Sequence, residues 1–290
     1  MLESFQVVAV YTFILGSLYL LISLGFSLIC GVLRIFHLGY GAIFVVAAYV
    51  TWMFMKEFGL SLIPSVILML IFQLIFILAT YYGIIKRYIE REEYLLISLL
   101  LIALIVEEAA NYKYPIIVGV DIPSTIIPGV LKIGGATIPY QMLIAALVGI
   151  IFTAIFVIFF LKSRIGLVMR CVSQNVRDSL LLGVNVERIY VYALLLAVIP
   201  PTICIIIIAP VWAIDPFLGW PLFTTAILIS IMGGLGNLKG SIMASYIVGF
   251  IHSYTSLLLN PRFTGLTTLV IVVLLLIFRP EGIARSESLW

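Results

Sequence analysis

Few side chains in this sequence are placed to act together in chemistry. Glu107 and Glu108 form a carboxylate pair at the close of a long apolar run. Such a pair held inside lipid would be a candidate proton relay, but it lies at the outer end of the run, so we expect it to be solvated. His37 and His252 each stand alone. We expect His37, with its neighbour Arg34, to be an interfacial anchor and His252 to be hydrogen-bonded among packed helices.

The sequence therefore predicts no catalytic residue, no metal site and no cofactor. It contains no G-x-x-x-x-G-K-[ST] loop that could hold ATP phosphates. The apolar runs carry no His pair, Ser-Lys dyad or Asp pair, which argues against a membrane-embedded enzyme. The cysteines lack the spacing of a metal site; they are Cys30, Cys171 and Cys204.

The amino-acid composition indicates the class of protein in which these residues lie. The chain has 290 residues, of which 64% are hydrophobic and 10% charged, and its mean hydropathy is +1.28. Soluble domains carry roughly 25% charged residues. The apolar runs are long and do not alternate, which favours helices over a barrel. We predict an all-α integral membrane protein, a polytopic helical bundle forming one domain over residues 1–290.

Apolar runs near 20 residues long predict about eight or nine membrane spans. The first is expected to be a retained span because the N-terminus lacks a basic n-region. Residues 222–259 contain a glycine-rich centre, so two interpretations stay open: two short spans joined at that turn, or a re-entrant hairpin. The runs cover about 7–32, 38–56, 60–85, 94–110, 140–161, 189 onward, 222–259 and 265–278. Pro200 and Pro201 predict a kink in the run that starts at 189. The Pro and Gly residues of 111–139 predict turns, with a short hairpin around 130–138.

The basic residues predict the orientation. If residues 86–93 and 162–188 face the cytoplasm, twelve Lys and Arg residues lie inside and four outside, and the N-terminus is outside. The outer four are Lys56, Lys113, Lys132 and Arg262.

The longest polar interval, residues 162–188, holds five of the sixteen Lys and Arg residues. Its apolar positions predict two short helices joined near residues 173–177 and lying along the membrane surface. A helix of this kind can place its apolar face in a groove of a partner protein. The alternative is a positively charged loop that only sets the topology.

This interval resembles the cytoplasmic loop of ABC-importer permeases of the high-affinity branched-chain amino acid type. Further similarities to that family lie at residues 31–35, 39–42, 48–49, 233–240 and 278–282. The matching loop positions are Gly166, Arg170, Asn175, Leu182, Gly183, Val184, Asn185 and Arg188.

The resemblance implies a multi-pass permease in a prokaryotic cell membrane that moves branched-chain or other hydrophobic amino acids. It implies two cytoplasmic ATPase subunits that dock on residues 162–188, a second permease that is identical or homologous, and an external solute-binding protein. Membrane lipid is the remaining partner, and no nucleic acid is expected. Two alternatives stay open: a related permease for urea, amides or sugars, and an ion-coupled secondary transporter, which would need an intramembrane carboxylate or an inverted repeat.

Glycines near the start and end of the chain are candidates for the translocation path, because broken helices often line the midplane site of transporters. The alternative is that small residues allow helices to pack closely. The candidate positions are Gly39, Gly41, Gly233, Gly234 and Gly236.

Overall fold

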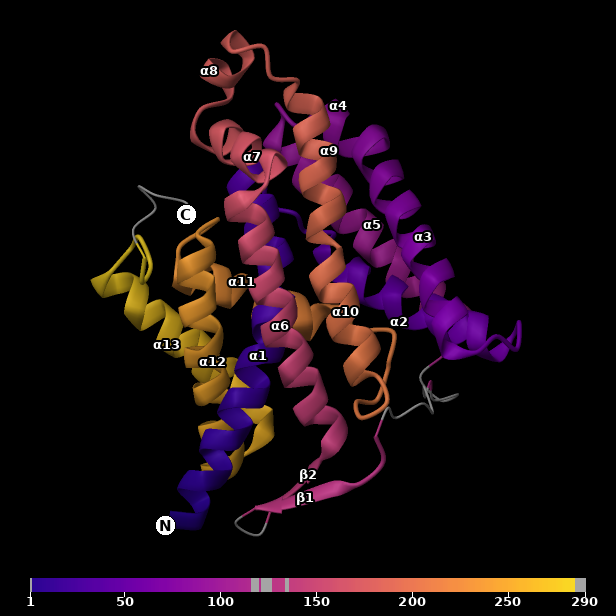
Figure 1. Ribbon diagram of the computed structural model, residues 1–290, viewed down its shortest axis with the longest axis vertical. Helices are drawn as coiled ribbons and strands as arrows, with labels where there is room; N and C mark the ends of the chain where they lie inside the picture. Colours follow the sequence, from indigo (N-terminus) through magenta and orange to yellow (C-terminus); the bar gives the residue numbers. More distant parts are fainter. Residues whose placement is uncertain (1, 116–119, 121–126, 134–135, 285–290) are drawn as a thin grey trace.

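A computed structural model describes residues 2–115, 120, 127–133 and 136–284. The chain forms an elongated helical bundle (Figure 1). We name its two ends by what lies there: the loop end carries α7 and α8, and the hairpin end carries the N-terminus and the β1–β2 hairpin. The elements are α1 Leu2–Val32, α2 Tyr40–Lys56, α3 Leu62–Thr80, the π-helix η1 Tyr81–Ile85, α4 Lys86–Tyr88, α5 Glu92–Lys113, β1 Val130–Ile133, β2 Ala136–Pro139, α6 Tyr140–Lys162, α7 Arg164–Gln174, α8 Val176–Leu181, α9 Val186–Ala197, α10 Ile199–Ile208, α11 Gly219–Gly233, α12 Leu238–Leu258, the 3-10 helix η3 Pro261–Phe263 and α13 Thr264–Phe278.

The predicted fold class is confirmed. Within the described residues, six helical segments are long and apolar enough to cross a membrane, and α2 and α11 are shorter apolar helices. The number of crossings stays a prediction. The hairpin expected in the loop after α5 is present as β1 and β2, which pair antiparallel.

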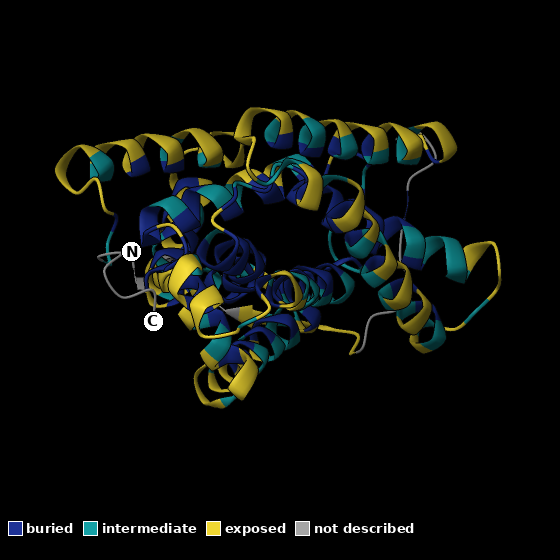
Figure 2. Ribbon diagram, turned by 90° about the horizontal axis from the view of Figure 1, so that it is seen from above, coloured by how far each residue is buried: buried dark blue, intermediate teal, exposed yellow. Residues whose placement is uncertain are grey.

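Helix α1 is the axis of the bundle. It has 31 residues and so is about 46 Å long. It packs against α6, α9, α10, α11 and α12, and most of its residues after Ile14 are buried. Seen along the bundle, buried residues occupy the interior and exposed ones the periphery (Figure 2).

Polar side chains join α1 to the last helices of the chain. The Ser27 hydroxyl lies 2.9 Å from that of Ser230 in α11 and 2.6 Å from that of Ser241 in α12. The Tyr19 hydroxyl lies 2.6 Å from His252 Nδ1 in α12. The expected hydrogen-bonded packing role of His252 is thus confirmed.

Glycines allow backbones to touch at three places around this axis. A Cβ on Gly31 would lie 3.0 Å from the Gly236 carbonyl oxygen, and one on Gly41 would lie 3.1 Å from that of Gly219. A Cβ on Gly240 would overlap the Gly233 carbonyl. Only small residues permit such close approach between helices.

Residues 222–259 form two helices joined at the glycine turn. Gly234 (φ 100) and Gly236 (φ 78) adopt left-handed backbone conformations between α11 and α12. The Asn237 side chain then accepts a hydrogen bond from the Gly240 amide at 3.0 Å and begins α12. With 15 residues, α11 rises only about 22 Å, less than the roughly 30 Å of a hydrocarbon core.

One other span is interrupted, and one connection between helices has an unusual backbone. The predicted break at Pro200 and Pro201 is confirmed, since α9 ends before them and α10 starts with them in its first turn. Between α1 and α2, residues 33–39 are not helical, and Arg34 has a positive φ of 56°.

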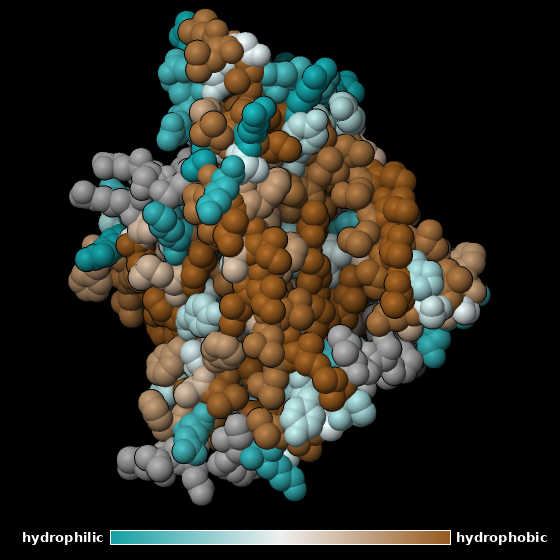
Figure 3. All heavy atoms as spheres, in the orientation of Figure 1, coloured by the Kyte–Doolittle hydropathy of each residue, from teal (hydrophilic) through white to brown (hydrophobic). Residues whose placement is uncertain are grey.

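The outer helices carry the surface expected to face lipid. Helices α3, α6 and α13 expose rows of Ile, Leu and Val side chains. In the space-filling view the middle of the molecule is almost continuously hydrophobic, and hydrophilic residues gather over α7 and α8 at the loop end (Figure 3).

The Gly233–Gly240 contact yields a stability prediction. Gly240→Ala should destabilise the protein by about 1–3 kcal/mol because its methyl group would overlap the α11 backbone. The melting temperature in detergent should fall by several degrees. Gly265→Ala is the matched control, because a Cβ there meets no atom within 4 Å. Equal melting temperatures for the two variants would contradict the proposed contact.

Candidate functional site

The interval between α6 and α9 forms the two short helices that the sequence predicts, α7 and α8. Helix α7 begins because the Ser163 hydroxyl accepts a hydrogen bond from the Gly166 amide at 2.9 Å. It buries Met169 and Val172 and exposes its opposite side. The joint between the helices is Asn175, inside the predicted range.

Asparagine side chains set the start of the next two helices. Asn175 Oδ1 accepts hydrogen bonds from the amides of Arg177 (2.9 Å) and Asp178 (3.3 Å), and its Nδ2 donates to Asp178 Oδ2 (2.7 Å). Asn185 Oδ1 accepts one from the Arg188 amide at 3.1 Å. Asn is among the residues that best satisfy the free N–H groups at a helix start. Asn175 and Asn185, two of the loop positions that resemble the permease family, therefore fix where α8 and α9 begin.

Gly183 ends α8. Its φ of 78° places it in the left-handed region, where glycine carries no steric penalty. Its amide donates to the Leu180 carbonyl and the Val184 amide to the Ser179 carbonyl, each at 3.0 Å. These bonds satisfy carbonyls that the helix end would otherwise leave free.

Gly166 and Arg170 hold α7 against the end of α6. A Cβ on Gly166 would overlap the Phe160 carbonyl. Arg170 Nη2 donates to the Leu161 carbonyl at 3.0 Å. The two matched residues therefore fix the angle at which α7 leaves the membrane-spanning helix.

Arg34, at the end of α1, has a structural role that sequence reasoning missed. Its Nη2 donates to the carbonyls of Ser173 (2.7 Å) and Gln174 (2.9 Å), at the C-terminus of α7. A guanidinium is well suited to this place because the last carbonyls of a helix carry partial negative charge. One sequence feature could have indicated this role: Arg34 directly follows a predicted span, on the same predicted side of the membrane as residues 162–188.

A second link reaches α9. Lys86 Nζ lies 2.6 Å from Glu187 Oε1, and both side chains are about half exposed. An exposed pair of this kind contributes little to stability. It nevertheless places the ends of α4 and α9 side by side at the loop end.

Helix α8 carries an uncovered apolar ridge. Leu180, Leu181 and Leu182 are 56%, 81% and 79% exposed. Val184 is half-buried, and the side chain of Arg188 is exposed. Leu180 and Leu181 of α8 and Leu182 directly after it are exposed together at the molecular tip and are a candidate protein-docking surface.

The candidate path glycines take part in close contacts. Gly233, Gly234 and Gly236 belong to the α11–α12 junction, whereas Gly39 and Gly41 lie where α2 begins. The two groups do not form one cluster. Gly219, not singled out from sequence, is the partner of Gly41. A role for the five positions in translocation stays a prediction.

Two expectations about polar groups are wrong. His37 is not an interfacial anchor: it is 2% exposed, and neither ring nitrogen has a hydrogen-bond partner among the described residues. Glu107 is not solvated: it is 8% exposed and accepts a hydrogen bond from Trp220 Nε1 of α11. Helix α5 packs against α2 and thereby withdraws Glu107 from the surface, while Glu108 remains exposed.

At the hairpin end, Glu57 connects the ends of α2 and α5. It accepts hydrogen bonds from the Tyr114 hydroxyl and from Lys113 Nζ, the latter at 3.0 Å. These two donors, Tyr114 first, hold the pKa of Glu57 below its usual value. A lowered pKa means that the link stabilises the folded state above the ordinary Glu pKa and is lost as the pH falls through the folded-state value.

Known proteins align with this sequence along nearly its whole length. Residues 8–278 match the family model described as branched-chain amino acid transport system / permease component. The chain is 20% identical over 284 residues to the high-affinity branched-chain amino acid transport system permease protein BraD of Pseudomonas aeruginosa, covering 92% of both chains. It is 23% identical to LivH of Salmonella typhimurium and 22% identical to LivH of Escherichia coli K12, covering 93% of this chain and 92% of each relative. No solved structure matches the chain.

The Arg34 contact yields a dynamic prediction. Arg34→Met removes two hydrogen bonds from the end of α7, a loss of about 1 kcal/mol. Amides of residues 171–175 should then exchange with deuterium about fivefold faster. Arg164→Met is the control, since that side chain is exposed and makes no hydrogen bond within the described part of the chain. Unchanged exchange in Arg34→Met would show that Arg34 does not hold the helix.

Proposed function

This chain belongs to the permease family of branched-chain amino acid transport systems, and from that premise we propose that it is the pore-forming subunit of an ATP-driven importer for branched-chain or other hydrophobic amino acids. The whole of residues 1–290 is then one permease domain. ATP is hydrolysed by two separate cytoplasmic subunits, and an external binding protein delivers the solute.

The leucine ridge of α8 is the observation that carries the docking proposal. Leu181 and Leu182 are about four-fifths exposed, although the same helix is fixed by side-chain caps at its start and by Gly183 at its end. A rigid apolar ridge fits a hydrophobic groove on a partner. We assign that groove to the ATPase subunit, with Leu182, Val184 and Arg188 on the contact face.

Specific contacts can transmit a displacement of α8 to the rest of the bundle. Helix α7 is joined to α6 through Gly166 and Arg170 and to α1 through Arg34. Since α1 packs on α6, α9, α10, α11 and α12, a displacement of α7 reaches all of them. Asn175, Gly183 and Asn185 keep the connecting backbone stiff. Gly39, Gly41, Gly233, Gly234 and Gly236 are proposed to let the broken helices move against one another beside the path.

The charge pattern supports a cytoplasmic loop end. Arg34 and Lys86 contact α7 and α9, whereas Lys113 lies beside Glu57 at the opposite end. The hairpin end then faces the binding protein. The exposed apolar rows on α3, α6 and α13 provide surface for lipid and for a second permease, whether identical or homologous.

Docking can be tested by co-purification. Leu181→Asp places a charge in the proposed groove and removes a leucine whose burial contributes about 1.5–3 kcal/mol. Recovery of the ATPase subunits with the permease should fall tenfold or more, and ATP-dependent leucine uptake should fall with it.

Leu259→Asp is the matched control, because Leu259 is 68% exposed and follows α12 at the hairpin end. It should leave ATPase recovery unchanged. Normal recovery and uptake in Leu181→Asp would rule out α8 as the docking element.

The orientation has its own test. Leu181→Cys, in a background carrying Cys171→Ser because Cys171 is exposed, should react with a membrane-impermeant maleimide only after the cells are opened. Leu259→Cys should react in intact cells. The reverse pattern would place the loop end outside.

A further inference from the structure

We infer that a pocket at the hairpin end, between the end of α10 and the start of α11, binds a small aliphatic amine, and that Asp215 receives its ammonium group; if the proposed function holds, that ligand is an aliphatic amino acid arriving from the binding protein. The inference deepens the proposed function by naming a receiving site on this chain. The lining residues are Ile205, Ile208, Ala209, Val211, Trp212, Ala213, Ile214, Asp215, Leu218, Pro221 and Leu222.

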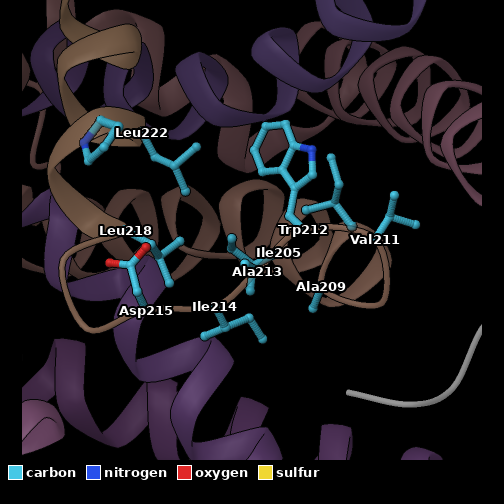
Figure 4. A pocket seen from close by; sticks show the side chains of 11 residues that line it. Ile205, Ala209, Val211, Trp212, Ala213, Ile214, Asp215, Leu218 and Leu222 are labelled. Atoms are coloured by element: carbon cyan, nitrogen blue, oxygen red, sulfur yellow. The ribbon is translucent and has the colours of Figure 1, made fainter. Parts of the chain in front are cut away.

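The size of the pocket suits a ligand of this class. Its volume is about 310 Å³, at the lower limit of the roughly 300–1,000 Å³ typical of small-molecule sites. The walls are mostly branched aliphatic side chains, among them Ile205, Ile214 and Leu222, and the Trp212 indole also lines the pocket (Figure 4). An aliphatic side chain would bury its surface there without leaving polar groups unpaired.

Within the described part of the chain, the lining contains one charged side chain, Asp215. Figure 4 shows its carboxylate at the edge of the aliphatic walls, next to Leu218. Oδ1 accepts a hydrogen bond from the Phe217 amide at 2.8 Å, and this bond orients the carboxylate. Oδ2 has no hydrogen-bond partner among the described residues and can therefore meet a ligand. Carboxylate–ammonium hydrogen bonds are shorter and stronger than neutral ones.

The loop that carries Asp215 is held in place on both sides. Ile214 pairs with Val120 in a β-bridge, and the Leu218 amide donates to the Asp215 carbonyl at 3.2 Å before α11 begins. Trp220, the second residue of α11, donates a hydrogen bond from Nε1 to Glu107 Oε2. The pocket therefore adjoins the short helix α11, whose first residue touches Gly41 of α2.

The charges of the pocket lining predict which ligands bind and which do not. Among the residues that the structure describes, the lining offers an anion for an ammonium group but no Lys, Arg or His for a carboxylate. The carboxylate of an amino acid must then face the pocket opening. A ligand without the carboxylate should bind, and one without the ammonium group should not.

The test measures binding of radiolabelled L-leucine to the purified full-length permease in detergent. Isoamylamine, which lacks the carboxylate, should compete with leucine, whereas 4-methylpentanoate, which lacks the ammonium group, should not. Asp215→Asn should raise the concentration for half-saturation about tenfold or more, because a charge-assisted hydrogen bond is lost. Ala213→Trp, at the exposed rim, should block the pocket and abolish binding.

Glu108→Gln is the matched control, since it makes the same kind of change at an exposed carboxylate near the same end, and it should bind leucine normally. Melting temperatures show whether each variant is folded. Leucine binding equal to wild type in folded Asp215→Asn and Ala213→Trp, or equal competition by 4-methylpentanoate, would overturn the inference.

ATP-driven leucine uptake by the complete wild-type transporter separates the two proposals. If uptake occurs and Asp215→Asn reduces it while leucine binding to the isolated permease is unchanged, the pocket contacts the partner protein and the inference is wrong. If no amino acid is taken up while isoamylamine and leucine still bind in an Asp215-dependent way, the receiving site stands and the proposed function fails.

Discussion

Contact between helix backbones is the constraint on which this architecture depends. In lipid, helices gain little by burying apolar side chains against one another, so packing distance and buried hydrogen bonds decide how they associate. Here α1 meets the α11–α12 junction at Gly31 and Gly236, and Ser27 bonds to both of those helices. Larger residues at these points would separate the axis from the helices that surround it.

Helix α1 also connects the two ends of the molecule through its contacts. Arg34 joins the end of α1 to α7, while further along the bundle α1 contacts α10 and α11, which flank residues 209–218. Close packing of this kind favours discrete arrangements of the helices over smooth deformation. Short or interrupted helices, such as α11 and the segment before α2, are the places where such a change can be accommodated.

Sequence reasoning was reliable where one residue determines its own local structure. Pro200 and Pro201 interrupt a helix because proline removes a backbone donor and clashes with the preceding turn. Asn175 begins α8 for an equally local reason, through its own side-chain oxygen. Sequence reasoning failed for His37 and Glu107, because the burial of a side chain depends on which helices lie beside it. Neighbours far along the chain, such as Trp220 for Glu107, cannot be read from spacing.

By itself the sequence determined the membrane environment, the helical class, the polar interval with its two short helices, and the family. Each of these follows from composition, run length or contiguous motifs. Only the tertiary structure decided that Arg34 holds α7, that Gly219 is the partner of Gly41, and that residues 205–222 enclose a pocket with Asp215 at its edge. These features join segments distant in the chain, and their geometry arises only when the helices pack.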